Sequence, residues 1–188
     1  MEDKSIKVFL SAGHSNVTNL DMGAIGVDGV KEGTLTVRLR KKIIAAMREY
    51  GHNPLYDKDE NVTSRTVKII KATLSSRDIA IDIHFNASAN KNATGTEVLV
   101  PFKSTPVERD LANILSSNIA TLLGIRNRGV KTEAQSYHGR LMFMTPNCEN
   151  VLIEVCFITN RSDMEKYYTQ EDNLAILIAR CIIGFITK

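Results

Sequence analysis

The sequence lacks any apolar run long enough to cross a membrane. No stretch of the 188 residues reaches the roughly 18 to 20 consecutive apolar residues that a transmembrane helix needs. The N-terminus, Met1–Ser5, leads directly into a predicted strand and has no apolar core of the kind found in secretory signal peptides. We therefore expect a protein without a membrane span that is made in the cytoplasm.

Cysteine is scarce and odd in number. The chain has three cysteines, Cys148, Cys156 and Cys181, and their spacing matches no metal-binding cysteine motif. Two of them lie within apolar runs, which favours buried free thiols over a disulfide bond. We expect no redox role for them.

No block of like charge is present either. The net charge is +3, and the basic residues are scattered along the chain, so the composition does not demand a nucleic-acid partner. A mildly basic chain does suit an anionic polymer such as a bacterial cell wall. Internal repeats, low-complexity linkers and shifts of composition are also lacking, so residues 1–188 are expected to form one domain.

What is present is an alternation of strand-like apolar runs with amphipathic helical patterns. The predicted strands lie at about residues 6–11, 53–56, 79–85, 95–102 and 150–157, and 139–144 is a further candidate. The predicted helices cover about 34–50, 61–74, 106–124 and the region from 172 onward, whereas 127–136 is expected to be a polar loop. This order predicts an α/β fold, a three-layer sandwich with a mostly parallel twisted sheet flanked by helices.

Four ionisable residues stand at predicted strand ends or loop edges, where an α/β sheet places its chemistry. His14 follows an apolar strand and a small-residue turn, and His84 ends another strand. Glu32 lies in the loop before a helix. Glu154 lies inside an apolar strand, where an unpaired charge costs roughly several kcal/mol unless a metal or proton compensates it. Two histidines and one carboxylate are a known catalytic zinc set, so these residues can supply one zinc site and one base.

Taken singly, these residues have simpler explanations. A histidine at a strand end is more often structural than a ligand, and Glu32 can be an acidic residue that favours a helix N-terminus. The other two histidines, His52 and His138, lack an apolar strand frame and are not expected to be ligands, although His138 can approach a substrate from a loop.

Several ordered blocks make a family resemblance. They are Leu10–His14, Gly23–Gly26 leading to Lys31–Glu32, Asp82–Ser88, Gly95–Val98, Asn127–Val130, and Leu152–Val155 closing with Thr159–Asn160. With these blocks the chain resembles the zinc-dependent N-acetylmuramoyl-L-alanine amidases of the Amidase_3 type. It departs from the usual pattern at Cys156, where the family commonly has glycine, and at Ser15–Val17, where a glycine-rich turn often follows the first histidine. Both departures resemble the catalytic domains of phage endolysins.

The resemblance assigns roles residue by residue. It implies that His14, Glu32 and His84 bind zinc and that Glu154 is the catalytic carboxylate. Asn86 and Arg128 are candidates for contacting the substrate or for orienting a metal-binding side chain through a hydrogen bond. Arg128 can pair with a carboxylate of a stem peptide.

The implied activity is hydrolysis of the amide between the lactyl group of N-acetylmuramic acid and the L-alanine of the peptidoglycan stem peptide. Two alternatives stay open on the residues alone: a zinc peptidase of the carboxypeptidase kind that cuts another amide, and a non-catalytic wall-binding or phage structural module. The expected partner is peptidoglycan, with a wall-targeting domain that is separate or has been removed. We expect action on the bacterial wall after phage-mediated release.

Overall fold

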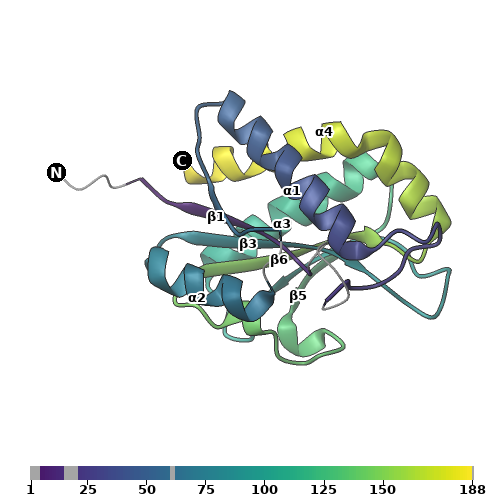
Figure 1. The fold of residues 1–188 in the computed structure, drawn as a ribbon, viewed down its shortest axis with the longest axis horizontal. Helices are drawn as coiled ribbons and strands as arrows, with labels where there is room; N and C mark the ends of the chain where they lie inside the picture. The colour runs from purple at the N-terminus through teal and green to yellow at the C-terminus, as the bar shows by residue number, and fades with distance from the viewer. Residues whose placement is uncertain (1–4, 15–20, 60–61, 188) are drawn as a thin grey trace.

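The computed structural model describes residues 5–14, 21–59 and 62–187 (Figure 1). Within these ranges the strands are β1 (Val8–Ala12), β2 (Leu55–Tyr56), β3 (Ile79–Asn86), β4 (Thr96–Val100), β5 (Asn127–Thr132) and β6 (Glu149–Phe157). The α-helices are α1 (Glu32–Glu49), α2 (Thr63–Thr73), α3 (Pro106–Leu123) and α4 (Arg161–Ile186), and two 3-10 turns are η1 (Glu133–Gln135) and η2 (Met142–Met144). None of the helices in the described ranges is both long and apolar enough to span a membrane.

The strands form one sheet in the order β2-β1-β3-β6-β4-β5. The first four of these run parallel to one another, β4 runs antiparallel to β6, and β5 runs parallel to β4. Helices α1, α3 and α4 cover one face, whereas α2 and the segment with η1 and η2 lie on the other (Figure 1). The predicted α/β fold with a mostly parallel sheet between helical layers is confirmed.

The alternation of side chains along β3 explains how the fold prepares a site. Ile79, Ile81 and Ile83 belong to the large core under α1, α3 and α4, whereas Ala80 packs with Ile70 of α2 on the opposite face. Because successive side chains of a strand point to opposite faces, Asp82 and His84 emerge on the α2 face. Two polar residues of a buried strand therefore share one face at the carboxyl end of the sheet.

Two predictions near the sheet edge are wrong. Residues 127–132 form strand β5 rather than a loop, because an edge strand that is partly exposed needs no apolar alternation. Residues 139–144 contain a turn and η2 rather than a strand. Phe143 and Met144 are buried beneath this irregular segment, so the apolar residues that suggested a strand serve as packing points for a loop.

Two helix boundaries also differ from the prediction. Helix α4 begins at Arg161 rather than near 172: the side chain of Asn160 caps it by accepting a hydrogen bond from the backbone N–H of Asp163 at 3.0 Å. The only apolar residues that the first turns of α4 bury are Met164 and Tyr167, among many charged residues, so the apolar pattern starts late. Glu32 is the first residue of α1 and not part of the preceding loop. Asn61, the expected start of the second helix, lies outside the described residues.

Candidate active site

A tight turn after β1 brings His14 to the end of β3. The backbone N–H of Gly13 donates to the carbonyl of Ile83 at 2.8 Å, and the hydroxyl of Thr36 in α1 donates to the carbonyl of Gly13 at 2.6 Å. His14 itself has a φ of 65°, an uncommon left-handed conformation for a residue other than glycine. A Cβ atom on Gly13 would lie 2.2 Å from Nε2 of His84, so the close approach of the two segments requires glycine here.

Glu32 is held in place from both of its oxygens. Its Oε1 accepts a hydrogen bond from the backbone N–H of Phe85 at 3.0 Å, and its Oε2 accepts one from that of Ala24 at 2.9 Å. Gly23 has a φ of 67°, and a Cβ there would lie 2.6 Å from Oε2 of Glu32. The buried carboxylate is thus oriented before any ligand binds.

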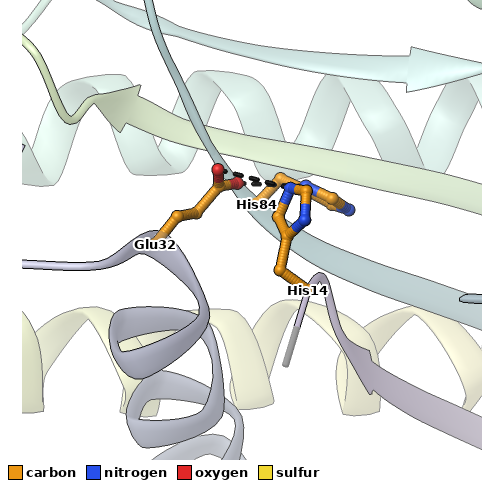
Figure 2. Close-up of side chains that lie close together, drawn as sticks. All are labelled: His14, Glu32 and His84. Atoms are coloured by element: carbon orange, nitrogen blue, oxygen red, sulfur yellow. Dashed lines mark hydrogen bonds and ion pairs between the residues drawn. The ribbon is translucent and has the colours of Figure 1, made fainter. Parts of the chain in front are cut away.

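His14, Glu32 and His84 converge (Figure 2). Each offers one ligand atom, and the three atoms all lie within 4.8 Å of one another. Nε2 of His14 is 3.3 Å from Oε2 of Glu32, and Nδ1 of His84 is 3.1 Å from Oε1. The turn after β1, the start of α1 and strand β3 each supply one of these side chains, and Figure 2 shows all three pointing toward one another.

The outer nitrogen of each imidazole meets another carboxylate. Nδ1 of His14 is 2.6 Å from Oδ1 of Asp21, and Nε2 of His84 is 3.1 Å from Oδ2 of Asp82. Histidines that bind metals commonly donate their far N–H to a carboxylate, which fixes the ring and its tautomer. This arrangement leaves Nε2 of His14 and Nδ1 of His84 directed at Glu32, and two imidazoles with one carboxylate fit a catalytic zinc ion.

The electrostatics of the cluster are strongly coupled. Burial lowers the pKa of His84, but the adjacent carboxylates of Asp82 and Glu32 outweigh burial and hold that pKa well above its usual range. Burial raises the pKa of Glu32, but hydrogen bonding to His84 and the charges of His84 and His14 outweigh it, so the net pKa is lowered. The site therefore favours a positive charge beside an ionised Glu32, which a bound cation can also provide.

Glu154 lies on β6, between His84 of β3 and Glu97 of β4 in the register of the sheet, and lines the same cleft as these two residues. Burial, partly opposed by His84 and reinforced by Glu32, Glu97 and Asp82, raises the pKa of Glu154 to about 8. Its Oε2 atom is buried and has no hydrogen-bond partner within the described part of the chain. A carboxyl group that changes protonation near neutral pH is suited to proton transfer.

Asn86 and Arg128 meet at Glu97 rather than at the three candidate ligands. The side-chain amide of Asn86 donates to Oε1 of Glu97 at 3.0 Å, and Nε of Arg128 donates to Oε2. Lys131 also donates to Oε2, at 2.6 Å. Because Glu97 is the register neighbour of Glu154, this polar group stands next to the candidate catalytic carboxylate.

The candidate ligands and their polar neighbours, Asp21 excepted, line one cleft of about 850 Å³: His14, Glu32, Asp82, His84, Asn86, Glu97, Arg128, Lys131 and Glu154. The segment that follows β5 also lines it, including Tyr137, His138 and Arg140. His138 thus reaches the cleft from a loop. His52 lines a different cavity, near the start of β1.

Four polar residues that contact the candidate site residues were not predicted from the sequence. Asp82 shares its face with His84 two residues away, and that spacing was a usable signal. Glu97 and Lys131 lie in or beside segments that carried the family resemblance, yet nothing in their spacing indicated that they would meet. Asp21 has no sequence signal, because nothing in its position along the chain indicates a contact with His14. Ser15–Val17, one of the departures from the family pattern, lies outside the described residues.

Comparison with known proteins now decides the family. A family model described as N-acetylmuramoyl-L-alanine amidase, Amidase_3, matches residues 8–184. The chain belongs to this amidase family. The match includes all four residues of the candidate metal and proton-transfer site, and it supports a peptidoglycan amidase activity for the chain.

Individual relatives of this amidase agree. The N-acetylmuramoyl-L-alanine amidase LytC of Bacillus subtilis is 28% identical over 162 residues, which cover 85% of this chain and 31% of LytC. The chain thus spans about a third of that relative. The crystal structure of an N-acetylmuramoyl-L-alanine amidase from Clostridium difficile 630 matches with a TM-score of 0.82 at 23% identity over 99% of both chains. The catalytic domain of the CD27L endolysin, which targets Clostridia difficile, matches with a TM-score of 0.75 at 24% identity over 95% of this chain and 97% of that one. The two structures share the fold.

Proposed function

We propose that this amidase is a zinc-dependent hydrolase that cuts the amide between the lactyl group of N-acetylmuramic acid and the L-alanine of the peptidoglycan stem peptide. One observation carries the proposal: His14, Glu32 and His84 converge beside Glu154 in a chain of the N-acetylmuramoyl-L-alanine amidase family.

A zinc ion at this site would be held by Nε2 of His14, a carboxylate oxygen of Glu32 and Nδ1 of His84. Zinc bound there supplies the Lewis acidity that activates water and polarises the scissile carbonyl group. Asp21 and Asp82 keep the two imidazoles in the tautomers and orientations that binding requires.

Glu154 moves the proton. Its carboxylate takes a proton from the attacking water and delivers it to the departing amide nitrogen, because an amine is a poor leaving group until it is protonated. Glu154 is the register partner of His84, so the proposed proton carrier is adjacent to the metal site without being needed as a fourth protein ligand beside His14, Glu32 and His84.

Asn86 and Arg128 have supporting roles. Both donate hydrogen bonds to Glu97, and both line the cleft. We assign Asn86 to orienting Glu97 beside Glu154, and Arg128 to contact with the peptide portion of the substrate.

Product analysis tests the reaction. Purified peptidoglycan is digested with the zinc-loaded protein, and mass spectrometry identifies the new termini. Cleavage as proposed frees the amino group of L-alanine and leaves an intact lactyl carboxylate on the sugar. A peptidase would free other amino termini within the stem peptide, and a non-catalytic wall-binding module would bind peptidoglycan, release no product and hold no stoichiometric zinc.

The biological setting follows from the substrate. We propose that the chain forms one catalytic domain that acts on the bacterial cell wall. We predict that the protein is released to the wall during phage lysis. We also predict that a separate wall-targeting domain directs it to peptidoglycan. A lysis assay with the chain alone and with candidate targeting domains added in trans tests the second of these.

A further inference from the structure

The cleft changes character beyond Glu154. Its metal end contains the two histidines with Glu32 and Asp82. Its other end, formed by β4 and β5, carries two cations, Arg128 and Lys131, and one carboxylate, Glu97. Positive charge is therefore in excess at this end, which we call the cationic end.

Arg128 is fixed in position before a substrate arrives. Its Nε atom donates to Oε2 of Glu97, and its guanidinium carbon lies 5.0 Å from the centroid of the Phe157 ring, a cation-π distance. Gly95 makes room for the side chain: its φ is 112°, and a Cβ there would lie 3.0 Å from Cγ of Arg128 and 2.4 Å from the carbonyl oxygen of Arg126. The hydrogen bond to Glu97 and the packing over Phe157 already restrict the Arg128 side chain, so binding a ligand there costs little additional side-chain entropy.

Lys131 shares the anchor of Arg128. Its ammonium group lies 2.6 Å from the same Oε2 atom, while Asn86 occupies Oε1. Glu97 is only 7% exposed; burial raises its pKa, but Arg128 and Lys131 outweigh burial and keep that pKa below its usual range. One ionised carboxylate balances only one of the two cations, so the pair keeps a net positive charge. The side chains of Arg128 and Lys131 are 27% and 23% exposed, which leaves both open to the cleft.

We propose that Arg128 and Lys131 form a carboxylate-binding subsite for the peptide portion of the substrate, so that the enzyme prefers stem peptides with a free carboxylate over those in which that group is a carboxamide. The inference rests on the proposed function, because it assumes that a muramoyl peptide lies in the cleft with its scissile amide at Glu154. A guanidinium offers paired N–H groups that match a carboxylate, and an adjacent ammonium adds charge. A carboxamide keeps the shape but lacks the charge.

Glu97 acts in this subsite as a positioning residue. It touches the two cations rather than the ligand, and it holds both at one point of the cleft wall. Its replacement by glutamine should leave the cations present but no longer aligned, so the expected effect falls on KM for the carboxylate substrate.

The test uses two synthetic substrates with the zinc-loaded full chain. One is an N-acetylmuramoyl peptide with a free carboxylate on its second amino acid, and the other is the same compound with that carboxylate as a carboxamide. We expect the wild type to prefer the free carboxylate in kcat/KM by about tenfold to a hundredfold, as hydrogen bonds to a charged group allow. R128Q and K131Q should each remove most of this preference by raising KM for the charged substrate. K131R, which keeps a positive charge at position 131, should retain the preference that K131Q loses. E97Q should reduce it in the same way.

A control variant and the remaining outcomes make the result decisive. R126Q removes a cation that is exposed and lies outside the cleft lining, and it should keep the wild-type preference. Equal hydrolysis of both substrates by the wild type, or equal loss on both in R128Q and K131Q with unchanged melting temperature, overturns the subsite while leaving the proposed function intact. Failure of the wild type to cleave either substrate, with peptidoglycan also undigested, overturns the proposed function and the subsite together.

Discussion

Glu154 stands beside His84 because the two residues are register partners across the parallel pairing of β6 and β3. The proposed metal ligand and the proposed proton carrier therefore come from two different, neighbouring strands. A substitution at Glu154 leaves β3 and its histidine in place, so metal binding and proton transfer can be separated by mutation.

Glu154→Ala should slow hydrolysis by about 10² to 10⁴, the usual worth of general acid and base assistance, while zinc content stays near one per chain. The fold should survive, because the substitution removes a carboxyl whose buried Oε2 atom has no hydrogen-bond partner in the described residues. Zinc stoichiometry, melting temperature and wall hydrolysis are measured on one preparation, with the isosteric Glu154→Gln alongside. Near-normal hydrolysis would remove Glu154 from the mechanism, and loss of zinc would make it a ligand.

His14→Ala and His84→Ala should each lose zinc and activity, because either change breaks the three-ligand set. His52→Ala is the matched control. That histidine lines a different cavity, and its replacement should keep both metal and rate. Elemental analysis of the purified variants, and the activity of the wild type in excess chelator, provide the measurements. Full activity of the wild type after chelation would refute zinc dependence.

Asp82→Asn should weaken zinc binding by about 10- to 100-fold, the usual cost of removing a carboxylate that orients a metal-binding histidine. The variant keeps the shape of the side chain but loses the charge beside Nε2 of His84. Asp78→Asn is the comparison at the opposite end of β3, where Asp78 accepts hydrogen bonds from Lys7 and Ser75. It should lower the melting temperature without changing zinc affinity. Competition with a chromogenic chelator measures the affinities, and equal affinity in Asp82→Asn and wild type would contradict the orienting role.

Gly13→Ala should disrupt the metal site more than the addition of a single methyl group suggests. The new methyl group would lie 2.2 Å from Nε2 of His84, so either the imidazole or the turn after β1 must move. We expect loss of tight zinc binding and at least about 100-fold lower activity, in line with the cost of a misplacement of about 1 Å at a reacting group. Gly184→Ala in α4 meets nothing within 4 Å and should be neutral or stabilising by up to about 1 kcal/mol. Equal zinc affinity in Gly13→Ala and Gly184→Ala would contradict the steric argument.

The cysteines should be dispensable for catalysis. Cys148, Cys156 and Cys181 are free thiols, of which only Cys156 is fully buried, so the expectation of burial is met by one of the three. Burial holds the pKa of the Cys156 thiol well above its usual range, and this residue should resist alkylation in the native state while reacting after denaturation. Mass spectrometry after iodoacetamide treatment follows each thiol. A loss of rate on mild reduction would show that a thiol or disulfide matters.

The pattern of residues by itself determined the layered fold and the kinds of side chain in the site. Apolar periodicity reports local burial. It was clear in β1, β3, β6 and α3, which contribute many buried apolar side chains to the main core. The apolar periodicity was weak in β5, an edge strand whose residues are all at least partly exposed, and in the charged first turns of α4. Two of the wrong predictions fall at these places, and a third, a strand at 139–144, came from apolar residues that pack an irregular segment.

Only the tertiary structure decided which polar groups meet. Glu32 and His84 are 52 residues apart, and Arg128 and Glu97 are 31 apart. Their contacts depend on strand register and on the close approach that Gly13 permits, and the contact of Asp21 with His14 is likewise set in three dimensions. A sequence pattern records whether a residue faces the core or the solvent, whereas a site of converging charges is set by distances across the sheet, and these exist only once the strands have paired.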